Sequence, residues 1–189
     1  IFSPLIILYR ILIGKEDPKR FVEKFCIYKN IYKKKRTIWI HAASIGEILS
    51  IIPIIKKLEK NQKISRILIT SLTTSSSLVL SKYKFKKTTH KYFPLDIDYI
   101  SKKFIRYWNP ELAIFVESEI WPNMYKNLHI KKIPIILLNA RISKKTFNKW
   151  KKISIFSKNI FGKISLAMPQ NEETCNYLKI LGVKNINNC

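Results

Sequence analysis

Short apolar runs alternate with longer segments of helical spacing along most of this chain. The apolar runs cover residues 37–42, 66–70, 88–93, 112–116, 134–138 and 164–167. The helical segments between them cover residues 45–60, 75–83, 97–108, 122–128, 143–157 and 171–181. Strands that alternate with helices form parallel sheets with right-handed crossovers, and strands that are apolar throughout are buried on both faces. The sequence therefore predicts an α/β fold built on a doubly wound parallel sheet.

The alternation starts only after a basic stretch, so the chain is predicted to divide into a lead, residues 1–32, and a domain, residues 33–189. Residues 1–13 are apolar apart from Ser3, Tyr9 and Arg10. A spanning helix needs about 20 apolar residues. The run could be the stub of a membrane segment, an interfacial helix or a helix docked on the core. We favour a membrane-associated end, and because residue 1 is not Met we expect an earlier start.

The chain is strongly basic, with 36 Lys and Arg against 12 Asp and Glu and a net charge of +24. Such a charge attracts nucleic acid, an acidic membrane surface or a phosphorylated substrate. Only six of the 36 cationic residues are arginine, the residue that reads bases best, and Ile and Asn are also abundant. We therefore expect no nucleic-acid partner and favour an anionic membrane. A basic binding module for either one stays the alternative function.

Polar residues cluster directly after the predicted strands, at the edge of the sheet where open α/β folds bind ligands. The chain has four glycines and no glycine-rich phosphate loop, which argues against a self-contained nucleotide site. Its three histidines and three cysteines share no metal-ligand spacing. We therefore predict neither a metal nor a bound cofactor.

The first polar segment joins the first strand to its helix and reads His41-Ala-Ala-Ser44-Ile-Gly46-Glu47. Its spacing fits a capping box, in which Ser44 caps the helix and Glu47 reaches back to the Ser44 amide. Alternatively, Glu47 faces the crevice as a general base. Helix-end charge would then lower the pKa of Glu47 and keep it ionised, ready to take a proton from a hydroxyl.

The second segment follows the fourth strand and contains Glu117, Glu119, Trp121, Pro122 and Asn123. A carboxylate directly after a buried run is costly unless it has a partner. Two acids, an indole and an amide within seven residues therefore favour a functional site. One of the acids could instead form a salt bridge with a lysine.

Hydroxyl groups crowd the turn after the second strand, at Thr70, Thr73, Ser75 and Ser76. Helix capping alone could explain them. The other interpretation is that their hydroxyls and amides hold a phosphate or a sugar at a helix N-terminus.

Asn139, Arg141 and Ser143 follow the fifth strand. Arg141 is one of the few arginines, and at the edge of a sheet it could contact an anion. Ser143 is predicted to cap the next helix.

Together these segments resemble the 3-deoxy-D-manno-octulosonic acid (Kdo) transferases of lipopolysaccharide synthesis. Residues 41–47 match the family pattern HAxSxGE, 117–123 match ESExWPN, and 139–143 match NARxS. Residues 92–96 resemble YxPxD, and residues 170–182 resemble QxEE followed by LG. The motifs occur in family order and span nearly the whole chain.

The resemblance implies the N-terminal half of a GT-B glycosyltransferase, a Rossmann-like domain that binds the acceptor. The family transfers Kdo from CMP-Kdo to a lipid A precursor such as lipid IVA, at the cytoplasmic face of the bacterial inner membrane. The resemblance also implies that Glu47 is the general base and that Glu117 helps to stabilise charge in the transition state. We expect the acceptor to be bound by His41, Ser44, Gly46, Thr70, Thr73, Ser75, Ser76, Asp96, Glu119, Trp121, Asn123, Asn139, Arg141 and Ser143.

Three features depart from the family pattern. Ser76 and Cys26 stand where the family has glycine. The chain also stops before the family's GxLKFD motif, whose lysine belongs to the catalytic site, and before the C-terminal domain that binds CMP-Kdo. We therefore expect a fragment that is inactive unless a second chain supplies the donor half.

Overall fold

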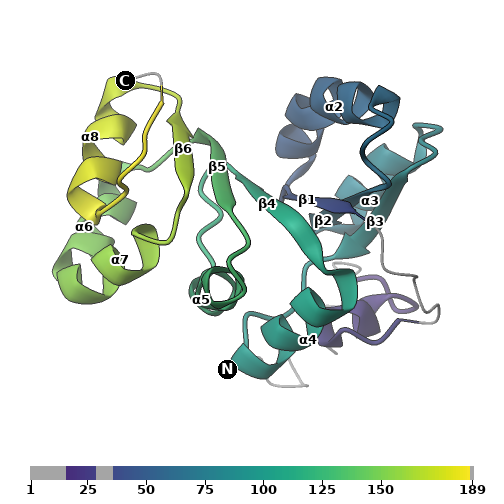
Figure 1. Ribbon diagram of the computed structural model, residues 1–189, viewed down its shortest axis with the longest axis horizontal. Helices are drawn as coiled ribbons and strands as arrows, with labels where there is room; N and C mark the ends of the chain where they lie inside the picture. Colours follow the sequence, from purple (N-terminus) through teal and green to yellow (C-terminus); the bar gives the residue numbers. More distant parts are fainter. Residues whose placement is uncertain (1–15, 29–35, 188–189) are drawn as a thin grey trace.

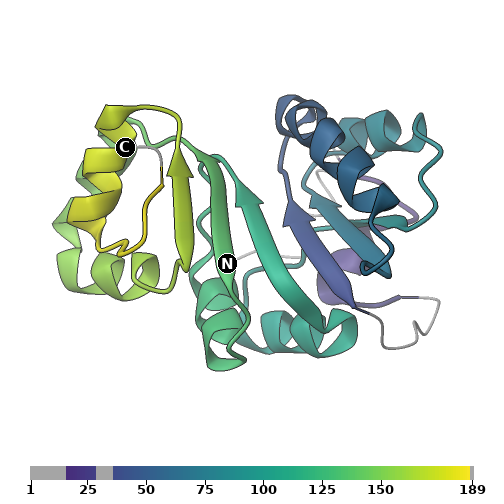
Figure 2. The same cartoon turned by 45° about the horizontal axis from the view of Figure 1, so that its top comes forward.

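A computed structural model describes residues 16–28 and 36–187. Its six strands are β1 (Thr37–His41), β2 (Arg66–Ser71), β3 (Thr88–Tyr92), β4 (Pro110–Val116), β5 (Ile135–Ala140) and β6 (Leu166–Pro169). All pair in parallel in one sheet of order β3-β2-β1-β4-β5-β6, and their arrows run the same way in Figure 2. This Rossmann-like order confirms the predicted fold class.

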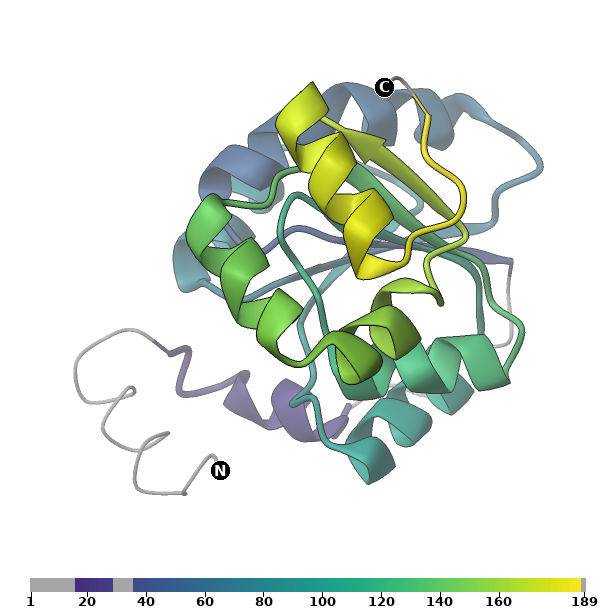
Figure 3. The same ribbon diagram turned by 90° about the vertical axis from the view of Figure 1, so that its left-hand side faces the viewer.

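Helices cover both faces of the sheet (Figure 1). They are α2 (Ile45–Lys60), α3 (Thr74–Ser81), α4 (Asp98–Trp108), α5 (Pro122–Ile130), α6 (Lys144–Lys152), α7 (Ser154–Phe161) and α8 (Glu172–Leu181). α2 and α3 pack on one face, and α4 and α5 pack on the other. The segment after α8 returns along β6, where Ala167 forms an isolated bridge with Ile186 (Figure 3).

The two faces of the sheet have different cores, because side chains alternate along each strand. In β1, Ile38 and Ile40 point to an isoleucine-rich core under α2 and α3. Trp39 points to an aromatic core under α4 and α5. His41 ends the strand with the same parity as Trp39, and its ring lies 4.0 Å from that of Phe93. The last residue of β1 is therefore on the aromatic side, at the carboxyl end of the sheet.

The helix predicted over residues 143–157 is two helices, α6 and α7, with a break at Ile153. The prediction of one continuous helix was wrong for a tertiary reason. Trp150 and Phe161 contact each other edge to face, with ring centroids 5.3 Å apart. Eleven residues of straight helix would separate them by about 16 Å. The break lets both rings pack into the same aromatic core.

The described part of the lead packs against the domain. It contains a short 3-10 helix, η1 (Phe21–Phe25), and the Leu95 amide donates to the Lys24 carbonyl at 2.9 Å. The apolar run 1–13 and the predicted boundary at 32/33 lie outside the described residues. Within the described ranges, no helix is both long and apolar enough to cross a membrane.

Candidate functional site at the carboxyl edge

The neighbouring strands β1 and β4 form the topological switch point of the sheet. They pair in parallel, with His41 opposite Phe115. β1 leads into α2 on one face, whereas β4 leads into α5 on the other (Figure 2). The two connections diverge, and such a point opens the crevice in which doubly wound sheets bind ligands. The 41–47 and 117–123 segments both lie at this point.

Glu47 sits in the first turn of α2 and is held by the residues before it. Ser44 caps the helix and accepts a hydrogen bond from the Glu47 amide at 3.3 Å. The Glu47 carboxylate accepts from the Ala43 amide at 2.8 Å and from the Ser44 hydroxyl at 2.8 Å. The capping alternative is therefore confirmed, except that Glu47 reaches the amide of Ala43 and not that of Ser44. The side chain is fixed at the crevice with 8% of the residue exposed.

The predicted direction of the Glu47 pKa shift was wrong. Burial raises the pKa of Glu47 above 4.5, the hydrogen bonds from Ala43 and Ser44 oppose this rise, and the charges of Glu119 and Glu117 add to it. A helix end favours a carboxylate, but here loss of solvent outweighs that effect. The consequence for chemistry is favourable, because a general base works best when its pKa approaches the working pH.

Glu119 is held by two nitrogen donors. Its Oε2 lies 3.0 Å from His41 Nε2 and accepts from Trp121 Nε1 at 2.8 Å. Its backbone carbonyl accepts from the Tyr125 hydroxyl at 2.9 Å. His41 and Tyr125 are fully buried, so the loop after β4 is tied to the aromatic core at three points.

Contacts on the far side of His41 hold its ring in place. His41 Nδ1 lies 3.0 Å from the Thr70 hydroxyl and 3.1 Å from the Thr70 carbonyl, and the hydroxyl also accepts from Trp39 Nε1 at 2.9 Å. On the near side, Nε2 donates to the Glu119 carboxylate, which can only accept. His41 is thus a positioning residue that orients a carboxylate.

Backbone strain marks the ends of β4 and β5. Glu117 has φ 58° and Asn139 has φ 53°, both in the left-handed region. This conformation costs about 1–2 kcal/mol for a non-glycine residue. The Glu117 amide donates to the Leu138 carbonyl at 2.9 Å, which ties the two strand ends together. Strain of this kind is concentrated at functional sites.

Asp96 and Asn123 connect the ends of β3 and β4 at the start of α5. The Asp96 carboxylate accepts from the amides of Asn123 and Met124 at 3.1 and 2.8 Å. The Asn123 side chain donates to the Asp96 carbonyl at 2.7 Å. Burial raises the pKa of Asp96, although these amides oppose the rise. Both residues therefore have structural partners at the start of the helix that follows Glu119.

Two of the remaining predicted site residues, Thr73 and Ser143, are helix caps. Thr73 caps α3 by accepting from the Ser76 amide at 3.2 Å, and its hydroxyl lies 2.7 Å from that of Ser76. Ser143 caps α6 by accepting from the Thr146 amide at 3.2 Å. These contacts confirm the capping interpretation without excluding a ligand.

Besides the exposed caps Ser44, Thr73 and Ser143, three predicted residues are open to solvent. Ser75 and Arg141 are exposed at the carboxyl edge. Gly46 is also exposed, and a Cβ added there would meet only the Ser44 hydroxyl, at 4.0 Å. Packing inside this domain therefore does not demand a glycine at position 46, and the backbone there is open to approach from outside.

Four of the twelve acidic residues of the chain belong to this edge: Glu47, Asp96, Glu117 and Glu119. Among the described residues, no lysine or arginine forms an ion pair with any of them. Within these ranges, the salt-bridge alternative for the second segment is thus met only by His41, whose Nε2 lies 3.0 Å from Glu119 Oε2. No group of metal-ligating side chains was found in residues 16–28 and 36–187.

Sequence reasoning missed Trp39, Phe93 and Tyr125, which support the site from beneath. Phe93 packs on the Trp121 ring, with centroids 4.6 Å apart. Trp39 precedes His41 by two residues, so strand periodicity could have placed both on one face. Tyr125 carried no comparable signal, because its contact depends on how the loop after β4 folds.

Comparison with known proteins identifies the family. The profile described as 3-deoxy-D-manno-octulosonic-acid transferase (kdotransferase) matches residues 19–189. The chain is 39% identical to the 3-deoxy-D-manno-octulosonic acid transferase of Rickettsia bellii over 97% of this chain and 44% of that protein. It is 30% identical to the same-named protein of Haemophilus influenzae over 90% of this chain and 41% of that protein.

A third relative is the probable mitochondrial 3-deoxy-D-manno-octulosonic acid transferase of Arabidopsis thaliana. It is 34% identical over 78% of this chain and 34% of that protein. The chain spans less than half the length of these relatives. With a profile match over most of its residues, the chain belongs to the 3-deoxy-D-manno-octulosonic acid transferase family.

Proposed function

We propose that this chain is the acceptor-binding part of a glycosyltransferase that moves Kdo from CMP-Kdo to lipid IVA. The observation that carries the proposal is the Glu47 carboxylate. It is fixed at the switch point of the sheet by Ala43 and Ser44, its pKa is raised by burial, and no cation of the described chain neutralises it. Family membership supplies the reaction class.

In the proposed reaction, Glu47 takes the proton of an acceptor sugar hydroxyl. The oxygen then bonds to the anomeric carbon of Kdo, while the bond from that carbon to the CMP phosphate breaks and CMP leaves with the electron pair. The transition state resembles an oxocarbenium ion, as in glycoside hydrolysis, so negative charge nearby stabilises it. Glu117 would supply that charge, and Glu119 would help to hold the acceptor in the position that His41 and Trp121 set.

Exposed polar groups at the carboxyl edge of the sheet suit a phosphorylated sugar. Arg141 and Ser75 are free to meet the acceptor, and the open backbone at Gly46 allows its close approach. The exposed hydroxyl of Thr73 lies at the start of α3 and could accept a further contact, whereas Ser76 is buried. CMP-Kdo would bind to the part of the protein that corresponds to the remaining length of the relatives. No cofactor or metal takes part in this proposal.

The proposed place of action is the cytoplasmic face of the bacterial inner membrane, with an anionic lipid surface as partner. The net charge of +24 favours such a surface. The apolar run 1–13 would add to the attachment.

The test is transfer of Kdo from CMP-Kdo to lipid IVA by the intact protein, together with any further chain that it carries. Glu47→Gln should lower the rate by about 10²–10⁴-fold, the usual contribution of a general base. The matched control is Glu111→Gln, because Glu111 is exposed at the opposite end of the sheet and pairs with Arg36. Full activity of Glu47→Gln would remove Glu47 from the mechanism, and equal losses in both variants would point to unfolding.

The basic-module alternative rests on charge alone. Two binding assays distinguish a membrane partner from a nucleic-acid partner. One is sedimentation with vesicles that contain lipid A, and the other is a gel shift with duplex DNA over a salt series. Tighter binding to DNA at moderate salt would favour the alternative.

A further inference from the structure

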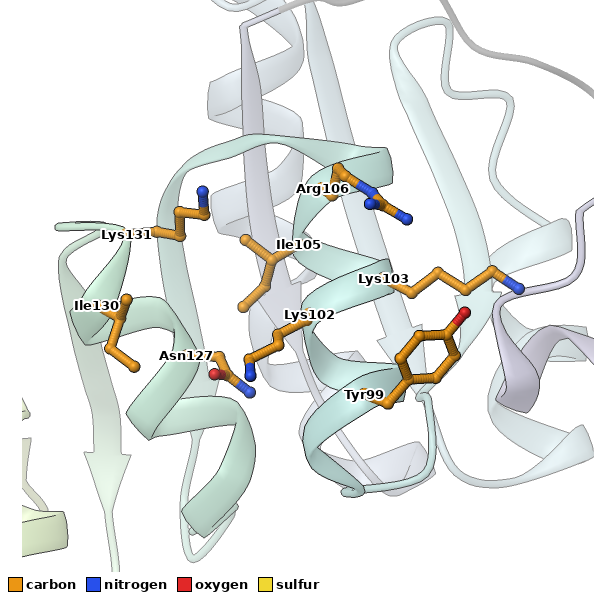
Figure 4. A pocket seen from close by; sticks show the side chains of 8 residues that line it. All are labelled: Tyr99, Lys102, Lys103, Ile105, Arg106, Asn127, Ile130 and Lys131. Atoms are coloured by element: carbon orange, nitrogen blue, oxygen red, sulfur yellow. The ribbon is translucent and has the colours of Figure 1, made fainter.

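A groove of about 380 Å³ lies between α4 and α5, on the face of the sheet opposite α2 (Figure 4). Four cationic side chains line it: Lys102, Lys103, Arg106 and Lys131. This groove is separate from the carboxyl edge that holds Glu47, because α2 and the α4–α5 pair cover different faces (Figure 1). It therefore needs an explanation of its own.

The cations of the groove are not all used by the fold. Asp98 pairs with Lys102 at 2.7 Å and with Lys126 at 3.5 Å. Lys103 reaches the Phe25 carbonyl at 3.4 Å. Arg106 and Lys131 are exposed, and no acid in the described part of the chain forms an ion pair with either. Among the described residues, three of the four lining cations, Lys103, Arg106 and Lys131, thus have no acidic partner, and the side chains of Arg106 and Lys131 also form no hydrogen bond.

A buried polar atom gives an independent sign of a ligand. Asn127 lines the groove, yet the residue is only 2% exposed. Its Nδ2 donates to the carbonyl and the carboxylate of Asp98 at 3.3 and 3.2 Å. These bonds fix the orientation of the amide and leave Oδ1 buried without a hydrogen-bond partner. Buried polar groups are nearly always paired, so Asn127 Oδ1 calls for a donor such as a hydroxyl.

Apolar side chains flank the same groove. Tyr99 is 70% exposed and Ile130 is 60% exposed, one on each of the two helices. In Figure 4, Lys131 and Arg106 lie toward one end of the groove, whereas Tyr99 lies at the other. A ligand that matches the cations, the Asn127 oxygen and the apolar side chains of this groove has an anionic group, a hydroxyl and an apolar part.

We propose that the α4–α5 groove binds the headgroup of a hydroxylated phospholipid, with phosphatidylglycerol as the representative. Arg106 and Lys131 hold the phosphate, a headgroup hydroxyl donates to Asn127 Oδ1, and the acyl chains run past Tyr99 and Ile130. Lysines and arginines on a protein surface bind anionic lipid headgroups through electrostatic attraction. The site deepens the membrane partner of the proposed function, but it does not depend on glycosyl transfer.

Sedimentation of the full chain with phosphatidylcholine vesicles, with and without phosphatidylglycerol, tests the groove. The double variant Arg106→Ala/Lys131→Ala should bind the anionic vesicles at least about tenfold more weakly. The control is Lys57→Ala/Lys60→Ala, which removes the same charge from exposed positions on α2. Equal weakening in both variants would overturn the proposal, because net charge alone would then explain binding. Kdo transfer is measured separately, so that a failure of the groove does not bear on Glu47.

Competition identifies the source of the phosphate. Dihexanoyl phosphatidylglycerol should displace the chain from vesicles better than glycerol 1-phosphate or inorganic phosphate does. Tyr99→Ser/Ile130→Ser should remove that preference, and Asn127→Leu should weaken binding of the hydroxylated lipid while the chain stays folded by circular dichroism. Equal competition by glycerol 1-phosphate would overturn lipid docking, as would a preference for duplex DNA over vesicles.

Discussion

Glu23 and Glu47 are both buried carboxylates, but the chain treats them in opposite ways. Glu23, in η1, accepts hydrogen bonds from Arg20 at 2.9 Å, from Lys91 at 2.8 Å and from the Tyr92 amide at 3.1 Å. Arg20 also donates through Nε at 3.2 Å. Burial opposes the ionisation of Glu23, but these four bonds outweigh burial and lower its pKa. At Glu47 burial dominates over the bonds from neutral donors, and the pKa is raised.

The difference lies in the partners and not in the acid. A chain with 36 lysines and arginines could have neutralised every carboxylate, and it neutralises Glu23 twice. At the switch point it supplies only an amide and a hydroxyl to Glu47. Glu23 thus fastens the lead to β3, whereas Glu47 keeps a proton affinity that chemistry can use.

The largest difference between the two acids should appear in the Kdo transfer rate when each acid is replaced by its amide in a separate variant. Glu47→Gln should reduce Kdo transfer by about 10²–10⁴-fold. Glu23→Gln should leave the transfer rate per folded molecule within about twofold, because Glu23 lies outside the crevice. Steady-state assays on both variants at matched folded concentrations check this. A comparable loss of transfer in Glu23→Gln would break the distinction.

Stability should show the reverse order. Glu23→Gln leaves Arg20 and Lys91 without their carboxylate and should lower the free energy of unfolding by roughly 3 kcal/mol. Glu47→Gln should change it by about 1 kcal/mol or less, because its partners are neutral. Urea unfolding at neutral pH measures both. A larger cost at Glu47 than at Glu23 would mean that the capping role of Glu47 dominates.

The donors to Glu119 should matter less than Glu47 itself. Trp121→Phe keeps a ring against Phe93 but removes the hydrogen bond from Nε1 to Glu119. Loss of one bond to a charged group should lower kcat about tenfold, with little change in unfolding. Kinetics of Trp121→Phe beside Trp121→Leu, which also removes ring packing, separate the two contributions. An unchanged kcat in Trp121→Phe would exclude the positioning role of this bond.

The smallest expected effect is on the pH dependence of stability. The pKa of Glu23 is lower in the folded state than in the unfolded chain, so its stabilisation is present above pH 4.5 and is lost as pH falls through the folded pKa. The pKa of Glu47 is raised, so its contribution is present below pH 4.5 and is lost as pH rises through the folded pKa.

Urea midpoints over a pH series should reveal both signs. The difference in urea midpoint between wild type and Glu23→Gln should shrink on acidification. The urea midpoint of Glu47→Gln should instead rise relative to that of wild type as pH increases. Parallel curves for the two variants would contradict the assignment of opposite shifts.

Much of the fold followed from local sequence, because each local signal had a local cause. Ser44, Thr73 and Ser143 precede helices at capping positions, and their short-range bonds confirm those predictions. The six strands and their parallel pairing agree with the predicted apolar runs, although the edge strands β3 and β6 are mostly half-buried, whereas the predicted burial covered both faces of every strand. The roles of individual site residues stay predictions.

What the sequence could not give depends on contacts between distant segments. The pKa of Glu47 is set by burial and by charges at Glu117 and Glu119, about seventy residues away, and the helix-end argument included neither. The break at Ile153 follows from a contact between Trp150 and Phe161 across the aromatic core. The groove between α4 and α5 carried no motif at all.

The most direct test of the central claim is a carboxyl NMR titration of Glu47 and Glu23 in the same sample. Neither catalysis nor a substrate is needed for this measurement. We predict that Glu47 titrates above 4.5 and Glu23 below it, since burial dominates at one and cations at the other. A Glu47 midpoint at or below that of Glu23 would contradict the account of Glu47 as an available base.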